Sequence, residues 1–198
     1  MSKKVVIRLS GGLGNQMFQY AFAYQFAKKN NATLYIDQHI FYYKKKAKYT
    51  NRNYELSVFG IQNKNFINPF KLNLKTNILF YKLIFFLKIL IYSYKIEHEI
   101  NPNRLINKNT YLIGYFQNYQ YYFNSNYCAK FIFQNFIFSD PLSKLNQLLL
   151  KQISFNNSVS IHIRRSDYIF INNINYHGVC SIIYYKNAIN YLLQNQNT

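Results

Sequence analysis

Four side chains that could bind and orient a phosphate lie within six positions near the carboxyl terminus: His162, Arg164, Arg165 and Asp167. A guanidinium group is a planar fork that pairs with two phosphate oxygens at once, so neighbouring arginines favour a phosphate or diphosphate ligand. The carboxylate could orient an arginine or the histidine. A solvated basic turn is the ordinary alternative, and this stretch alone leaves both interpretations open.

The residues around this cluster predict the strand that would position it. Apolar and polar side chains alternate over 158–164, which is the period of a β-strand. The β-branched side chains would share one face: Val159, Ile161 and Ile163. His162 and Arg164 would share the other face. Ligands of open α/β sheets bind at the carboxyl ends of strands, and this pattern places the cluster there.

A glycine-rich turn near the amino terminus is the second candidate site. Residues 4–9 predict a buried strand, residues 10–16 contain three glycines, and residues 17–29 predict a helix. Glycines let the backbone approach a ligand closely, and the amide groups at a helix start can hold an anion. Position 17 is Met, so the Gly-x-Gly-x-x-Gly pattern is incomplete and no nicotinamide or flavin site is predicted.

A second strand over 32–36 ends at Asp37, so this region predicts a β-α-β unit and a parallel sheet. The chain has only six Asp and Glu residues. If a carboxylate acts as a base, Asp37 is a geometric guess, because it ends a strand. His177 and Cys180 have ligand-like spacing, but two ligands do not make a zinc site, so no metal site is predicted.

The net charge of the chain indicates which classes of partner it could bind. The 198 residues include 24 Lys and Arg, and the formal net charge is +18. This sign favours phosphorylated ligands, anionic lipid or nucleic acid, although part of the excess reflects a composition rich in Asn, Lys, Ile, Tyr and Phe. The basic and aromatic residues 41–54 favour a solvated surface loop, with nucleic-acid binding as the alternative.

An apolar segment over 78–95 contains three lysines, which makes it a poor membrane span. The lysines fall in one broad sector of a helical wheel, so the segment predicts an amphipathic helix. Such a helix could pack in the core, which we favour, or lie on an anionic membrane. Further elements are predicted as a strand over 110–113 and helices over 140–153, starting at Asp140-Pro141, and 182–194.

Several stretches together resemble the α-1,2-fucosyltransferases. Ile7–Tyr20 is similar to the amino terminus of that family, and His162–Tyr168 is similar to its H-x-R-R-x-D-Y motif, which other GDP-fucose-dependent transferases share. Gly114–Gln117 matches a Gly-Tyr-aromatic-Gln stretch, and Tyr176–Ser181 also follows the family pattern. Ser166 stands where the family has a glycine, and a later motif rich in Asn, Ser and Trp is absent.

The resemblance implies an α/β fold of the GT-B type. A Rossmann-like domain over 1–156 would handle the acceptor, and 157–198 would begin a second, incomplete Rossmann-like domain that binds the donor. The implied activity is inverting transfer of fucose from GDP-fucose to the 2-hydroxyl of a galactoside in a surface glycan. The chain would then be a fragment of such an enzyme.

The resemblance also implies roles for the candidate residues. The catalytic residues would be Arg164, which offsets charge on the leaving diphosphate, and Asp167, with Asp37 as the guess for the base. The donor-binding residues would be Gly12, Gly14, Asn15, Gln16, His162, Arg164 and Arg165. No metal and no cofactor besides the donor substrate GDP-fucose would be needed, because arginine performs the electrostatic task.

The implied partners are GDP-fucose and a galactose-terminated glycan, without specific binding of nucleic acid. The implied location is the cytoplasm, with peripheral contact at the inner face of an anionic membrane. Two other interpretations stay open. The chain could be an inactive fragment of such an enzyme, or a basic module that binds nucleic acid or membrane surfaces.

Overall fold

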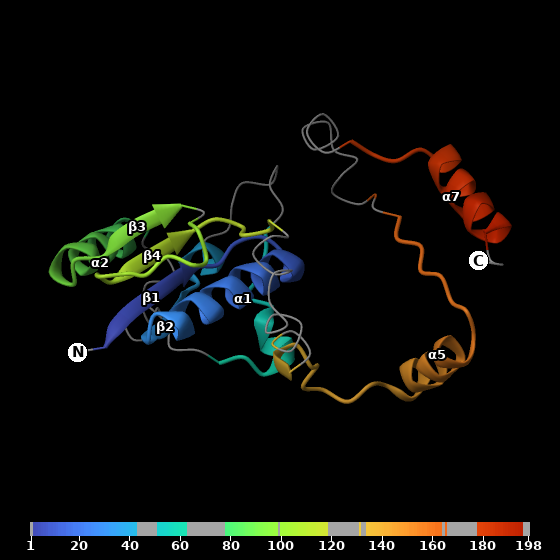
Figure 1. The fold of residues 1–198 in the computed structure, drawn as a ribbon, viewed down its shortest axis with the longest axis horizontal. Helices are drawn as coiled ribbons and strands as arrows, with labels where there is room; N and C mark the ends of the chain where they lie inside the picture. The colour runs from blue at the N-terminus through green and yellow to red at the C-terminus, as the bar shows by residue number, and fades with distance from the viewer. Residues whose placement is uncertain are drawn as a thin grey trace. The chain divides into compact units, whose positions relative to one another are not determined.

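The computed structural model describes residues 2–42, 51–62, 78–98, 100–118, 131, 134–163, 165 and 178–195. The chain divides into two units, Met1–Pro141 and Leu142–Thr198, whose elements are labelled in Figure 1. The domain boundary predicted at 156/157 stays a prediction. Each unit is described below by itself.

The first unit is built on a parallel sheet of four strands, in the order β2-β1-β4-β3. The strands are β1 (Lys3–Arg8), β2 (Ala32–Asp37), β3 (Lys95–His98) and β4 (Thr110–Ile113). Their parallel pairing confirms the predicted α/β class and the β-α-β unit at the amino terminus. Side chains of successive residues point to opposite faces, so β1, β2 and β4 contribute to two separate cores.

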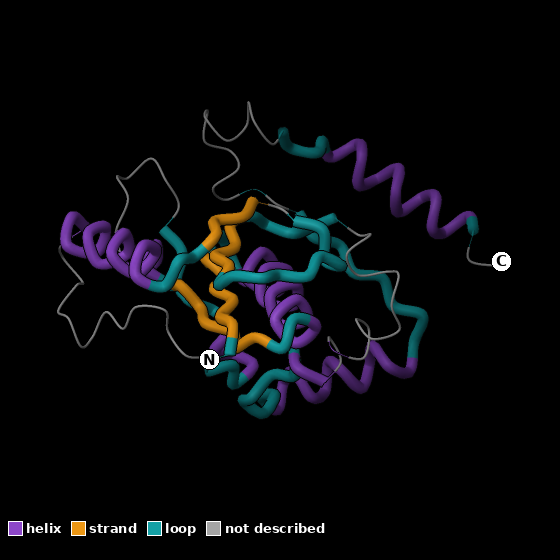
Figure 2. Tube along the Cα trace, turned by 60° about the vertical axis from the view of Figure 1, so that its left-hand side comes forward, coloured by secondary structure: helices purple, strands orange, loops and turns teal. Residues whose placement is uncertain are grey.

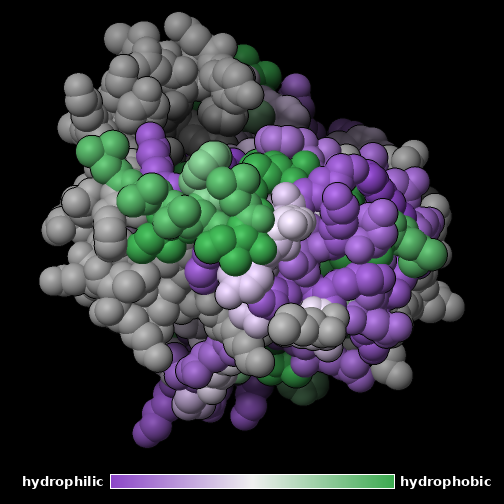
Figure 3. All heavy atoms as spheres, turned by 90° about the vertical axis from the view of Figure 1, so that its left-hand side faces the viewer, coloured by the Kyte–Doolittle hydropathy of each residue, from purple (hydrophilic) through white to green (hydrophobic). Residues whose placement is uncertain are grey.

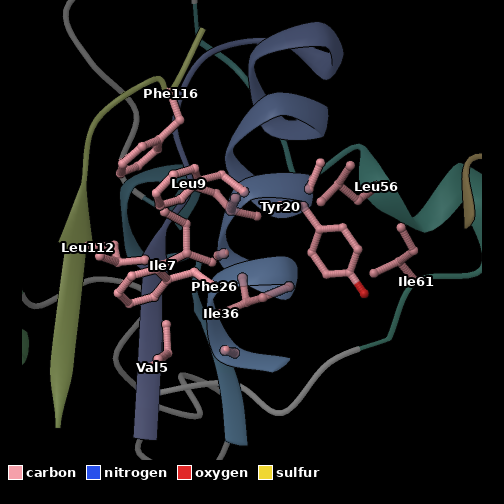
Figure 4. Close-up of a cluster of buried hydrophobic side chains, with 14 of the residues drawn as sticks. Val5, Ile7, Leu9, Tyr20, Phe26, Ile36, Leu56, Ile61, Leu112 and Phe116 are labelled. Carbon is pink, nitrogen blue, oxygen red and sulfur yellow. The ribbon is translucent and has the colours of Figure 1, made fainter. Parts of the chain in front are cut away.

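Helix α1 (Leu13–Lys29) covers one face of the sheet, and its apolar side chains make the larger core. Figure 4 shows Val5, Ile7 and Leu9 of the first strand region packed against residues of α1. The stretch after β4 joins this core through Phe116, whose ring stacks on Phe22 with centroids 4.2 Å apart. The short 3-10 helix η2 (Leu56–Phe59) adds the buried Leu56.

Helix α2 (Ile78–Ile91) covers the opposite face, as Figure 2 shows. Ile84, Phe85 and Ile89 pack there against a small buried cluster that includes Tyr111. The rings of Phe85 and Tyr111 meet edge to face with centroids 5.1 Å apart. The predicted helix is therefore present and packs on the core, but it ends at Ile91, and β3 begins at Lys95, the last residue of the predicted helix.

In the described part of the second unit are helices α5 (Lys144–Phe155) and α7 (Ile182–Gln194), which have no buried residues. The helix α5 was predicted from Asp140, yet Ser143 is its N-cap and accepts a hydrogen bond from the Asn146 amide. The Ser143 hydroxyl therefore satisfies one of the free amide groups at the helix start, which is the role predicted for Asp140.

The predicted strand before Arg164 is wrong for the described residues 158–163, which form no strand. Val159, Ile161 and Ile163 are about half exposed. A strand needs hydrogen bonds from a neighbouring strand, and none of the described residues pairs with this segment. Within the described residues, no helix is long and apolar enough to cross a membrane.

The contrast between the units yields a stability prediction. Leu112 on β4 is fully buried, whereas Leu148 on α5 is 60% exposed. We expect Leu112→Ala to lower the free energy of unfolding by about 2–5 kcal/mol, because it leaves a cavity in the core. Leu148→Ala should change it by less than about 0.5 kcal/mol. Urea unfolding followed by circular dichroism measures both, and equal losses would contradict this account of the core.

Candidate active site at the carboxyl edge of the sheet

The loop between β1 and α1 lies at the carboxyl edge of the sheet. Gly11 has φ +78°, and a Cβ atom there would lie 2.2 Å from Nδ2 of Asn15. Only glycine fits this position without a shift of the loop. Gly12 is the N-cap of α1, and no side chain caps the helix start there. The helix therefore presents its amide groups and its partial positive charge at this edge.

Gln16 holds a second segment against this loop. Its side chain is fully buried, and its amide nitrogen donates to the carbonyl oxygens of Gly11 (3.0 Å) and Asn53 (2.8 Å). Its amide oxygen accepts from the backbone N–H of Glu55 at 2.9 Å. All three hydrogen bonds are internal, so the structure gives Gln16 a positioning role, and its predicted contact with the donor stays a prediction.

Gln19, one helical turn further on, joins the loop to the end of β4. Its amide oxygen accepts from the backbone N–H of Ser10 at 3.0 Å, and its amide nitrogen donates to the carbonyl oxygen of Gly114 at 3.0 Å. At the exposed side, Nε2 of Gln117 donates to Oδ1 of Asn15 at 2.7 Å. The glycine-rich loop and the Gly114–Gln117 stretch therefore meet at one place.

Arg52 brings a positive charge to the same place. A Cβ atom built on Gly12 would lie 3.9 Å from both Cζ and Nη1 of Arg52. The guanidinium group is thus in contact range of the helix start, and both favour an anion. The space within 4 Å of a Cβ built on Gly14 holds no atom outside the loop and helix backbone, so a ligand could approach the backbone there.

Asp37 ends β2 at the same edge and is 2% exposed. Its Oδ1 accepts from the backbone N–H of His39 and lies 3.0 Å from Nδ1 of that ring. Its Oδ2 accepts a hydrogen bond from the Tyr111 hydroxyl. The carboxylate itself is enclosed, whereas the His39 side chain is 22% exposed.

The negative charge of Asp37 shifts the pKa of several neighbouring side chains. Burial, followed by the nearby charge of Asp37 and its hydrogen bond, raises the pKa of Tyr111 well above its ordinary value. Burial and then Asp37 also raise the pKa of Tyr42. Burial, followed by the positive charge of Lys4, lowers the pKa of Lys88. The negative charge of Asp37 acts in the opposite direction and raises it. Both tyrosines therefore stay protonated donors at neutral pH.

The predicted phosphate-binding cluster belongs to the second unit. Arg164 and Asp167 lie outside the described residues. His162 and Arg165 are described and exposed. Their predicted roles stay predictions. No group of three potential metal ligands occurs among the described side chains.

Sequence reasoning missed four residues that shape this edge: Gln19, Arg52, His39 and Tyr111. The sequence places Arg52 in a predicted solvated loop. Its contact with Gly12 depends on the hydrogen bonds that Gln16 makes to Asn53 and Glu55, which lie 37 and 39 residues further along the chain. Tyr111 reaches Asp37 from 74 residues away. Only His39, two residues after Asp37, offered a local signal, because Asp and His at this spacing can pair.

The buried amide of Gln16 leads to a prediction. We expect Gln16→Ala to lower the free energy of unfolding by about 2–4 kcal/mol, since it leaves buried backbone groups without partners. Gln147→Ala is the matched control, because Gln147 is an exposed helical glutamine with one backbone hydrogen bond. It should have little effect in the same chemical denaturation experiment, and a comparable loss would contradict the special role of Gln16.

Comparisons with known proteins show which family this chain is similar to. Residues 4–198 match glycosyl transferase family 11. An alpha-1,2-colitosyltransferase of Escherichia coli is 30% identical over 98% of this chain and 65% of its own length. The O-antigen biosynthesis glycosyltransferase WbnK of Escherichia coli is 33% identical over 93% of this chain and 66% of its own length.

The chain thus spans just under two thirds of the length of these curated relatives. No solved structure matches it significantly. The family match covers both units and both groups of candidate residues, the carboxyl edge of the sheet and the arginine-rich stretch. This chain belongs to glycosyl transferase family 11.

Proposed function

We propose that this chain carries the site of an α-1,2-fucosyltransferase, which moves fucose from GDP-fucose to the 2-hydroxyl of a galactoside in a surface glycan. The observation that carries the proposal is the meeting of the glycine loop, the Gly114–Gln117 stretch and Arg52 at one edge of the sheet. Membership of the family supports glycosyl transfer. The α-1,2 linkage in the name of one relative supports the regiochemistry.

The donor's diphosphate needs positive charge when it leaves. In this proposal Arg164 neutralises the charge that builds on GDP, while His162, Arg165 and Asp167 hold the donor and orient the guanidinium. Fixed cations act strongly in a cleft that excludes water, because the local dielectric constant is low. Arginine would perform this task without a metal ion or a further cofactor.

The acceptor hydroxyl must lose a proton as it attacks. We assign this proton to Nε2 of His39, with Asp37 as the positioning residue that fixes the ring through Nδ1. The acceptor oxygen forms a bond to the anomeric carbon, the bond from that carbon to the diphosphate oxygen breaks, and its electron pair leaves with GDP. An enclosed carboxylate that orients a partly exposed imidazole is the arrangement of many general bases.

Calorimetric titration with GDP-fucose tests donor binding. We expect saturable binding by the 198-residue chain and weaker binding of GMP. Arg164→Ala should weaken GDP-fucose binding by about tenfold to a hundredfold, because a charge-assisted hydrogen bond contributes about 1.5–3 kcal/mol. Arg104→Ala is the control, since Arg104 is exposed and pairs with Glu97. GDP-colitose, titrated beside GDP-fucose, tests the choice of sugar.

The opposite result would favour another function. If the folded chain bound nucleic acid with a steep dependence on salt and ignored the sugar nucleotide, the basic-module interpretation would replace this proposal. If the Arg164→Ala chain bound GDP-fucose as tightly as the unchanged chain, Arg164 would not be part of the donor site.

The proton acceptor is tested by transfer to a galactose-terminated oligosaccharide. His39→Gln should lower kcat by about a hundredfold or more while donor affinity is kept, because general-base catalysis supplies about 10²–10⁴ in rate. The control is His98→Gln, at an exposed histidine on β3. In a double-mutant cycle, Asp37→Asn should add little to His39→Gln. Additive losses would show that Asp37 does not act through His39.

A further inference from the structure

Helix α2 carries an apolar face that the sheet does not cover. Its outward side chains are between 44% and 73% exposed: Leu79, Leu83, Phe86, Leu87, Leu90 and Ile91. Figure 3 shows apolar side chains gathered into one patch on the side of the molecule that carries α2, next to a hydrophilic area. Soluble monomers rarely expose large contiguous apolar patches, and such a patch commonly marks a site of interaction with a protein, a membrane or a ligand.

The spacing of these residues makes them one stripe. Leu79, Leu83, Phe86 and Leu90 follow each other at intervals of four, three and four residues, which is the repeat of a single helix face. The core of the first unit is served by the opposite face, through Ile84, Phe85 and Ile89. The exposed stripe is therefore not explained by the packing of the fold.

The charged side chains of α2 itself have one sign. The sequence of α2, ILFYKLIFFLKILI, contains two lysines and no acidic residue. Lys82 and Lys95 are exposed. The nearby acidic side chain Glu97 is 14% exposed and is paired with both Lys95 and Arg104. With a net charge of +18, this part of the surface complements an anionic partner.

We propose that the outer face of α2 docks on an anionic lipid surface. Apart from one tyrosine, the helix has only apolar side chains and lysines, whereas protein interfaces have a polar rim and are depleted in lysine. Amphipathic helices that lie in the membrane plane combine Leu and Phe with Lys in this way. At about 1.5 Å per residue, α2 is about 21 Å long, which suits lying in the interface.

Sedimentation of the whole chain with lipid vesicles tests this proposal. Binding is expected to phosphatidylcholine vesicles that contain phosphatidylglycerol, and much less to phosphatidylcholine alone. Leu83→Gln with Leu90→Gln should weaken the binding about tenfold or more, since several buried methylene groups are lost. Lys82→Gln should weaken it about fivefold. The control is Leu105→Gln with Leu145→Gln, at two leucines elsewhere that are even more exposed.

A fluorescent probe gives a second, independent measurement. The chain has no tryptophan, so Phe86→Trp introduces a single reporter on the stripe, and Leu105→Trp introduces one away from it. Anionic vesicles should shift the emission of the Phe86→Trp chain to shorter wavelength, and brominated lipid should quench it. The Leu105→Trp chain should show neither change.

Each other outcome overturns the proposal. It fails if the folded chain ignores the vesicles, binds both lipid mixtures equally, or binds equally after the two leucines of the stripe are replaced. If sedimentation without lipid shows a dimer that the same replacements dissociate, a second copy of the chain occupies the face. These measurements need neither donor nor acceptor, so they do not depend on the proposed transfer reaction.

Discussion

Two buried glutamines on α1 hold the functional edge of the first unit together. Gln16 and Gln19 are fully buried, and each satisfies backbone groups from segments that are distant in the sequence. An amide left unpaired in a core costs more than its hydrogen bonds contribute, so these contacts specify one route for the loop. The glycine loop, Arg52 and the end of β4 all depend on that route.

The sequence was sufficient for the elements whose signals are local. Alternating or continuous apolar runs predicted β1, β2 and β4, and the glycine turn placed the start of α1 within a few residues. The strand β3 was missed because Lys95–His98 alternates charged or titratable residues with one isoleucine, which is the composition of an exposed sheet edge. The strand predicted at 158–163 was wrong because pairing is a non-local property that periodicity cannot supply.

The candidate site residues also separate into those with a local sequence signal and those that depend on the fold. The glycines, Asn15 and Gln16 could be named from one stretch of sequence, whereas Arg52 and Tyr111 needed the fold. Asp37 shows why. Its position after a strand suggested a base, but its burial demands partners, and the alternation of the sheet places Tyr111 on the same face as Asp37. In the proposed reaction the acceptor proton therefore goes to His39, whose ring the Asp37 carboxylate orients.

Helix α2 shows how far composition alone determines a role. A helix with as many apolar side chains as α2 is expected to be buried on most sides, yet the sheet of this unit covers only one of its faces. The lysines do not form the outward polar face that a water-exposed helix would have, because Lys88 is half-buried beside Lys4. The outer stripe is thus unfavourable in water and favourable at a lipid surface, where its exposed methylene groups leave water and the exposed Lys82 meets anionic headgroups.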